Sequence, residues 1–204
     1  MFRPILLVIL EHVWKFLLIG TFLFAFIRYL YFKKSRKKLV FYKEVLLYLC
    51  FIYFVCLFYV VTFEDVIWST SNYIPFKEIT RYPVGSYAFM KNVIGNIIMF
   101  VPLGFFIGYY TKIKKKKWVF LIVLAVSFFI EIMQDYLGRV FDIDDILLNV
   151  FGGLLGYLVC MSFKNIKSNL PSLLKKNAVY NIIVVVLLIL FICYLGNIIK
   201  VGVL

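Results

Sequence analysis

The sequence predicts an all-α protein, a polytopic bundle of six transmembrane helices. Its composition is the first reason: of 204 residues, 64% are hydrophobic and 20% aromatic, and the mean hydropathy is +0.98. One soluble domain of this length cannot enclose so much apolar surface, and a disordered chain would be far less hydrophobic. The second reason is that the apolar residues form charge-free runs near the length of about 20 residues that crosses a bilayer as helix. An ordinary cytosolic enzyme is therefore excluded.

Five of these runs support spans well, and a sixth is interrupted by charge. The five cover residues 45–63, 93–111, 118–130 with a continuation to residue 137, 146–163 and 178–199. The sixth, residues 5–27, contains Glu11, His12 and Lys15, of which Glu11 and Lys15 stand at i and i+4 and can pair on one helix face. We expect this run either to span the bilayer or to lie on its surface.

Lysine and arginine concentrate in every second loop, which predicts the orientation because short basic loops stay on the cytoplasmic side. The basic clusters lie within residues 33–43, 112–117 and 164–176. Acids gather on the other side: Glu64, Asp65, Glu78, Glu131, Asp135, Asp142, Asp144 and Asp145. Both termini are therefore predicted to be extracytoplasmic. The net charge of +13 arises in the basic loops, which indicates topology and contact with anionic lipids rather than nucleic acid binding.

Small residues predict close packing between two of the spans. Gly104 with Gly108, and Gly152 with Gly156, each form a small-x-x-x-small face that lets backbones approach. Pro102 lies within the third span, where it removes a backbone donor and is expected to kink the helix.

Polar side chains on three predicted spans fall at one shallow depth. At about 1.5 Å per residue, Asn96, Gln134 and Asn149 each lie about 4.5 Å inside the extracytoplasmic end of their span, and Glu131 lies about 9 Å inside. Asn92 and Asn96 stand at i and i+4, which predicts one shared helix face. The sequence thus predicts a polar layer near the extracytoplasmic surface.

Glu131 is the strongest functional candidate in this layer. A charge at the bilayer centre costs about 2.5 to 3.5 kcal/mol and less near the interface, whereas a hydrogen bond between membrane helices returns only ~0.6 kcal/mol. Hydrogen bonding alone does not offset its burial, so a functional role is favoured. A purely structural pair with Arg139 is the alternative.

The loop of residues 64–91 is too long for a simple turn. It contains apolar and aromatic residues, so a short amphipathic segment near residues 76–82 is expected to fold back and cover the polar layer. A plain surface loop is the alternative.

Four stretches resemble the VanZ-like membrane protein family. They are NYIPFKEI at residues 72–79, NVIGNIIMFVPLGFFIG at residues 92–108, Glu131 with Gln134, and RVFDIDDILLNVFGGLLGYL at residues 139–158. The resemblance implies a multipass protein of a bacterial cell membrane and, for some members, lowered susceptibility to teicoplanin and other lipoglycopeptide antibiotics. It maps the family's polar signature onto Asn92, Asn96, Glu131, Gln134, Arg139, Asp142, Asp145 and Asn149. The implied organisation is a VanZ-like core of four spans at residues 45–163, preceded by residues 1–44 and followed by residues 164–204.

The favoured hypothesis is a binding protein whose outer-leaflet polar pocket, lined by these eight residues, recognises an amphiphilic cell-envelope ligand. A lipoglycopeptide or a peptidoglycan precursor would suit. Glu131 and Asp145 would hold a cationic or hydroxyl group and Arg139 an anionic one. Membrane lipids are the other expected partner; no cofactor and no nucleic acid are expected, and no pattern specifies an oligomeric state.

Three alternatives remain open. The first is a membrane enzyme acting on a lipid head group or a polyprenyl-linked cell-wall substrate, with Glu131 as acid or base and Asp142, Asp144 and Asp145 as possible ligands of a divalent cation. The second is a transporter or scramblase, which the absence of an internal repeat disfavours. In the third, the polar residues only lock the helices together.

Overall fold

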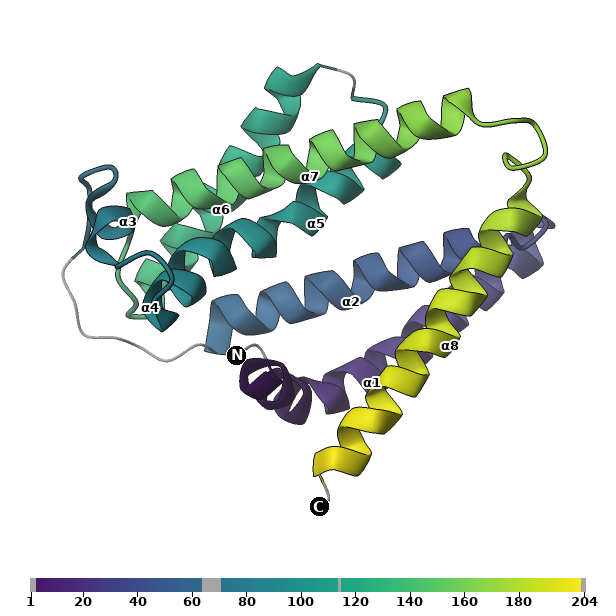
Figure 1. The fold of residues 1–204 in the computed structure, drawn as a ribbon, viewed down its shortest axis with the longest axis horizontal. Coiled ribbons are helices and arrows are strands. Elements are labelled where there is room, and N and C mark those ends of the chain that lie inside the picture. Colours follow the sequence, from purple (N-terminus) through teal and green to yellow (C-terminus); the bar gives the residue numbers. More distant parts are fainter. Residues whose placement is uncertain (1–2, 64–70, 114, 203–204) are drawn as a thin grey trace. The chain divides into compact units, whose positions relative to one another are not determined.

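The computed structural model describes residues 3–63, 71–113 and 115–202, and it confirms an all-helical membrane architecture (Figure 1). The chain is 81% helix, and the described residues form no β-strand. Six helices are long and apolar enough to cross a membrane. The side of the membrane on which the termini lie stays a prediction.

The helical elements differ widely in length. The long ones are α1 (Arg3–Ser35), α2 (Phe41–Phe63), α5 (Gly95–Tyr110), α6 (Lys116–Tyr136), α7 (Ile143–Asn169) and α8 (Asn177–Gly202). Before α5 come two short helices and a π-helical turn: α3 (Lys77–Arg81), α4 (Tyr87–Phe89) and η1 (Met90–Ile94). Because α4, η1 and α5 are continuous, they form one candidate span, Tyr87–Tyr110.

The first span ends later than the run of apolar residues predicts. Its candidate segment is Val13–Ser35, whereas the prediction ended at Ile27. The physical reason is an ion pair: Arg28 Nε and Nη2 donate to the two carboxylate oxygens of Glu44 at 2.6 and 2.8 Å, so its charge does not end the helix. The side chains of Glu11 and His12, and all of Glu64 and Asp65, lie outside the described residues.

The chain divides into two compact units. One comprises Met1–Lys15 and Tyr53–Asn165, and the other comprises Phe16–Ile52 and Ile166–Leu204. In the second unit, polar contacts join α1, α2 and α8: the hydroxyls of Thr21 and Tyr48 lie 2.6 Å apart, and Tyr42 N–H donates to Asn181 Oδ1 at 3.0 Å. The division into residues 1–44, 45–163 and 164–204 stays a prediction.

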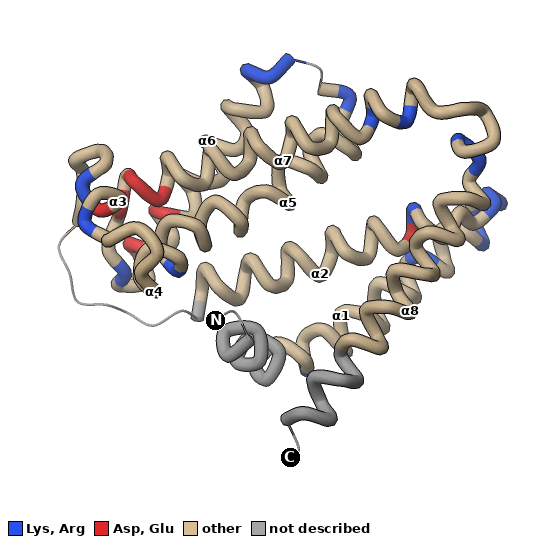
Figure 2. Tube along the Cα trace, viewed as in Figure 1, with Lys and Arg blue, Asp and Glu red and all other residues tan. Residues whose placement is uncertain are grey.

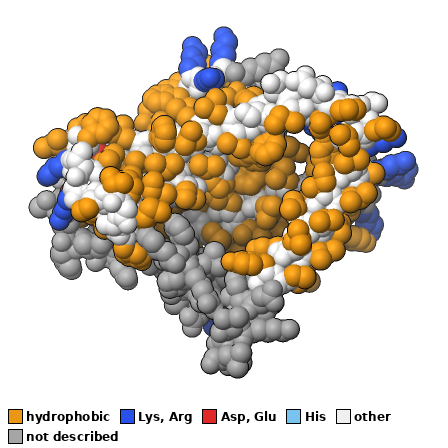
Figure 3. Space-filling view, in the orientation of Figure 1, with side chains coloured by type: hydrophobic (Ala, Val, Ile, Leu, Met, Phe, Trp, Pro, Cys, Tyr) orange, Lys and Arg blue, Asp and Glu red, His pale blue; other side chains and the backbone are white. Residues whose placement is uncertain are grey.

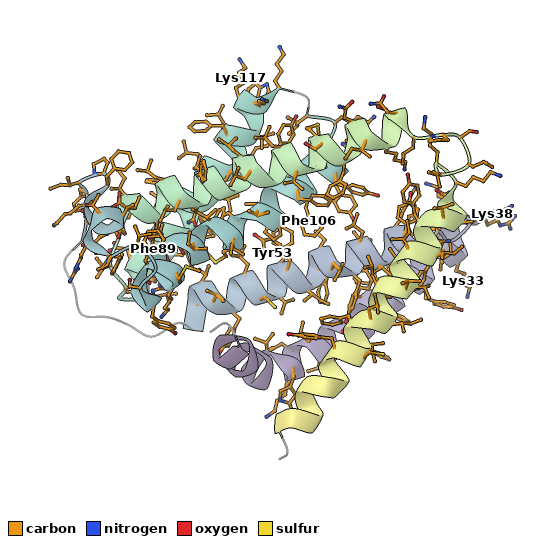
Figure 4. The ribbon with its side chains drawn as sticks, viewed as in Figure 1. Lys33, Lys38, Tyr53, Phe89, Phe106 and Lys117 are labelled. Carbon is orange, nitrogen blue, oxygen red and sulfur yellow. The ribbon has the colours of Figure 1, made fainter. Side chains whose placement is uncertain are left out.

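The core of the first unit lies between α5, α6 and α7. Phe100 of α5, Val119 and Val123 of α6 and Tyr157 of α7 are almost completely buried there. Tyr53 of α2 joins this core; its hydroxyl donates to Met99 O at 3.0 Å, and its ring lies 5.9 Å from that of Phe106 (Figure 4).

Glycines let α5 and α7 approach to backbone contact. A Cβ atom at Gly104 would lie 1.7 Å from Gly153 O, and one at Gly156 would lie 1.8 Å from Val101 O. Only a residue without a side chain fits at either position. The predicted small-residue faces therefore lie where two helices touch.

Charge is divided between the two ends of the first unit. Asp and Glu residues gather where α6 ends, α7 begins and α3 lies, with several Lys and Arg residues beside them, and lysines mark the start of α6 and the last part of α7 (Figure 2). Between these ends the visible surface is mostly apolar (Figure 3), as expected for helices that face lipid. The acidic end is where the polar layer was predicted.

Candidate polar site

The end of α6 folds the chain back along the helix. Gly138 takes a left-handed backbone (φ 83°), which permits the paired hydrogen bonds of a Schellman motif. Gly138 N–H donates to Asp135 O at 3.0 Å, and Arg139 N–H donates to Gln134 O at 2.9 Å. These bonds close the helix end and direct residues 139–142 toward the α6 interior.

Glu131 receives this returning segment. Its side chain is only 2% exposed, and its Oε2 accepts the N–H of Asp142 at 3.1 Å. In the amide orientation that satisfies both of its ends, Gln134 donates to Glu131 Oε1 at 3.2 Å and accepts from Arg139 Nη1 at 2.7 Å. Glu131 lies five residues before Tyr136, which is about 7.5 Å along the helix. The connecting segment therefore returns along α6, and α7 begins at the level of Glu131, well below the end of α6.

Asn72 pairs with the segment that enters α7. Its N–H donates to Phe141 O at 2.8 Å, and its carbonyl accepts from Ile143 N–H at 3.1 Å, which forms a short parallel bridge. Its side-chain Nδ2 donates to Asp142 Oδ1 at 2.8 Å. The same oxygen accepts Asp144 N–H at 2.9 Å, so Asp142 caps the first turn of α7.

Asp144 attaches α3 to the start of α7. Its carboxylate is 1% exposed and accepts the backbone N–H groups of Phe76, Glu78 and Ile79, the last two at 2.8 and 3.2 Å. These are orphan donors at a helix N-terminus. Phe76 has a left-handed backbone (φ 67°), a conformation that costs a bulky residue about 1–3 kcal/mol. Three hydrogen bonds to a buried carboxylate hold this strained turn in place.

Asn92 and Asn96 bind different partners, although their spacing predicts one shared face. Asn96 Nδ2 donates to Asp145 Oδ1, which joins α5 to α7. Asn92 lies in the π-helical turn η1 and hydrogen-bonds with Tyr82 of the preceding loop. A π-helix has more residues per turn than an α-helix, so the i and i+4 positions no longer align.

Asn149 lies one turn further along α7 from Asp145. It is 1% exposed, and its Nδ2 donates to Ser127 Oγ of α6 at 3.0 Å. Its Oδ1 is buried without a hydrogen-bond partner among the described atoms. Asn149 therefore joins α6 to α7 and keeps an unused acceptor beneath the other polar groups.

Two groups outside the spans resist ionisation. Burial raises the pKa of Asp142, although hydrogen bonds from a backbone N–H and from Asn72 act in the opposite direction. Burial also raises the pKa of Tyr82, and the neighbouring Glu78 carboxylate adds to the rise. In both groups, burial is the largest cause of the shift because it disfavours the charged form.

These residues form what we call the polar cluster: Asn72, Asn96, Glu131, Gln134, Arg139, Asp142, Asp144 and Asp145. Glu131 and Asp144 are buried, whereas Arg139, Asp142 and Asp145 are partly exposed. Carboxylates outnumber guanidinium groups, so the cluster offers acceptors for an ammonium or hydroxyl group beside one cation for an anion. Among the described residues, no three Asp, Glu, His or Cys side chains are placed as ligands of a metal ion.

Most of the predicted site residues come together at this end. Glu131, Gln134, Arg139 and Asp142 share one set of hydrogen bonds, Asn96 pairs with Asp145 at the start of α7, and Asn92 and Asn149 lie at the margins of this end. Sequence reasoning missed Asn72 and Ser127 and considered Asp144 only as a cation ligand. Asn72 opens the stretch NYIPFKEI, and Ser127 is the only hydroxyl residue between Trp118 and Ile130, so each carried a weak signal.

Comparison with known proteins gives one match. The model of the family VanZ/LLP1 matches residues 45–166, which include most of α2, the polar cluster and most of α7. No curated protein and no solved structure matches the chain.

Proposed function

The chain belongs to the VanZ/LLP1 family, and we propose that it contributes to resistance against teicoplanin and related lipoglycopeptides by recognising an amphiphilic cell-envelope ligand at the polar cluster. The cluster carries this proposal because it combines buried, fixed acceptors with partly exposed charged groups. When the lipid tail of an amphiphilic ligand lies in the membrane, its polar head lies at the same depth as these groups.

The observation that supports the proposal best is the irregular backbone at the level of Glu131. Residues 139–142 and Asn72 are not helical, yet Asp142 N–H bonds to Glu131, about 7.5 Å from the end of α6. Non-helical backbone at membrane depth is tolerated only where protein buries it or where it lines a hydrated cavity. Polar backbone together with the seven carboxyl or amide side chains of the polar cluster provides recognition groups that helix packing alone does not need.

Partly exposed groups supply the contacts to the ligand. Arg139 would bind a phosphate or carboxylate, and Asp142 and Asp145 would accept hydrogen bonds from amine or hydroxyl groups. Glu131 and Gln134 would orient Arg139 from behind. By the positive-inside rule, the basic loops at the other end of the unit favour an extracytoplasmic position for this cluster, the side on which lipoglycopeptides and cell-wall precursors are found.

The test compares Glu131→Gln with Asp135→Asn. Both remove a carboxylate near the end of α6, but Asp135 is exposed and lies outside the cluster. In a susceptible bacterial host with matched membrane levels of each protein, Glu131→Gln should lose the increase in teicoplanin tolerance, and Asp135→Asn should keep it. A fluorescent lipoglycopeptide should likewise bind at least tenfold more weakly to Glu131→Gln in nanodiscs. Unchanged tolerance and unchanged binding in Glu131→Gln would refute the proposal.

A further inference from the structure

The loop around α3 has large apolar side chains that the described residues of the first unit leave exposed. We call residues 73–87 the interfacial segment; its exposed apolar side chains are Tyr73, Ile74, Phe76, Val84 and Tyr87. Phe76 is 61% exposed and Val84 is 87% exposed. Side chains project from this end of the unit around α3 and α4, where Phe89 is labelled (Figure 4). A loop bathed in water would be expected to expose polar residues here instead.

Ring contacts connect this segment to the membrane-facing side of α6. The ring of Tyr73 stacks on Phe141 with centroids 5.4 Å apart, and Phe141 packs edge-on against Phe128 at 6.3 Å. Phe128 is half-exposed within the candidate span Lys116–Tyr136, on a surface that we expect to face lipid. The lipid-facing surface therefore continues without a break from α6 to the interfacial segment.

The exposure of Phe76 is built into the backbone. Asp144 binds the N–H of Phe76 and of the first residues of α3, and Thr80 Oγ1 donates to Phe76 O at 2.8 Å. These contacts hold a left-handed turn that directs an aromatic side chain away from the core. Strain that the surroundings maintain at an exposed position indicates a function for that position.

The polar residues of α3 form a basic helix face, which is the second feature expected of a segment at the membrane interface. Lys77, Thr80 and Arg81 are exposed and spaced i, i+3 and i+4, so they share one side of the helix. Arg81 Nη1 also bonds to Glu78 at 3.1 Å. An apolar loop beside a basic helix face matches the boundary between lipid chains and phosphate groups, where aromatic residues and long basic side chains concentrate.

We propose that the interfacial segment inserts into the head-group boundary of the surrounding leaflet, with Tyr73, Ile74 and Phe76 against lipid chains and Lys77 and Arg81 at the level of the phosphates. Lipid is the occupant because the segment lies between two membrane spans and continues the lipid-facing surface of α6. The insertion fixes the height of α3, and thereby of the Asp144-bound start of α7, relative to the membrane surface. It does not depend on which ligand the polar cluster binds.

Tryptophan fluorescence in lipid nanodiscs tests this placement. Trp14, Trp68 and Trp118 are replaced by Phe, and Phe76→Trp, Val84→Trp and Thr80→Trp are introduced one at a time. Each protein is measured in phosphatidylcholine with and without bromine on the acyl chains, and with acrylamide in solution. Far-ultraviolet circular dichroism confirms that each variant keeps its helix content.

Brominated lipid should quench Phe76→Trp at least twofold, and Val84→Trp should follow in the same direction. Acrylamide should quench both several-fold less than it quenches Thr80→Trp, which reports the polar side of α3. The proposal is overturned if Phe76→Trp and Val84→Trp are insensitive to bromine and as open to acrylamide as Thr80→Trp. Because no antibiotic is present, this result is independent of the outcome of the Glu131→Gln test.

Discussion

Replacing Gly156 by alanine tests whether backbone contact between α5 and α7 holds the first unit together. A Cβ atom at Gly156 would lie 1.8 Å from Val101 O and 2.7 Å from Val101 C. Cβ atoms essentially never come within 3.0 Å of another heavy atom. Because the obstacle is backbone, it cannot rotate away as a side chain would. The two helices must therefore separate by about 1.2 Å at this point.

The expected cost follows from overpacking. Added methyl groups in well-packed interiors destabilise by about 1–3 kcal/mol, and an immovable neighbour places this site at the upper end of that range. For a protein of this length, 1 kcal/mol corresponds to a shift of about 2–4 °C in melting temperature, so Gly156→Ala should melt about 6–12 °C below the wild type. Val123 of α6 packs against Gly153 one turn earlier, so the separation also disturbs the contact between α6 and α7.

Gly95→Ala is the matched control. Its Cβ atom would lie 3.7 Å from Met90 O, an ordinary contact, and alanine in a continuous helix is favoured over glycine by about 0.5–1 kcal/mol. The assay heats both variants and the wild type in the same detergent at one scan rate and measures the remaining monodisperse protein. If Gly156→Ala melts no lower than the wild type, or if Gly95→Ala falls equally far, the backbone-contact argument is refuted.

Two further predictions concern the acidic end. Asp144→Ala should leave three backbone donors of the α3 turn without an acceptor, so hydrogen exchange at residues 76, 78 and 79 should accelerate at least tenfold while the α5 amides keep their protection; equal protection would contradict the attachment. Burial raises the pKa of Asp142, so the stability it contributes is complete below its unfolded pKa and is lost as the pH rises through its folded pKa. Asp142→Asn should therefore melt higher than the wild type at pH 7 and lose that advantage toward pH 4, and an advantage that does not change with pH would contradict this.

The sequence was sufficient to predict the membrane helices because their signal is local. Most spans are apolar runs of a fixed minimum length with few charged residues, so hydropathy and charge locate them without knowledge of any contact. The end of the first span was misplaced for a corresponding reason. In the sequence, Arg28 marks the end of an apolar run. In the structure, its charge is paired with Glu44, so the helix continues past it.

The positions of Asn96, Glu131 and Gln134 along their spans also predicted that these residues would lie near the same end of the bundle, but they did not predict their hydrogen-bond partners. Residues at equal depth on different helices come together only if those helices are adjacent, which the glycine faces suggested for α5 and α7. The role of Asn72 depends on the path of a loop, and that path is set by hydrogen bonds to Asp142 and Phe141. No periodicity in the sequence specifies such a pairing, so it becomes visible only in the structure.

The glycine contact and the polar cluster are two consequences of the same approach between α5 and α7. A Cβ atom at Gly152 would lie 2.1 Å from Ile97 O, and Ile97 directly follows Asn96. Gly152 is two turns along α7 from Asp145, so the contact that brings the two backbones together also brings Asn96 within hydrogen-bond reach of Asp145. A bond between short side chains on neighbouring helices exists only when those helices touch. The small residues in the middle of the span thus determine the geometry of the polar residues at its end. We therefore expect a substitution in the glycine contact to disturb the Asn96–Asp145 bond, and the loss of that bond to disturb the glycine contact.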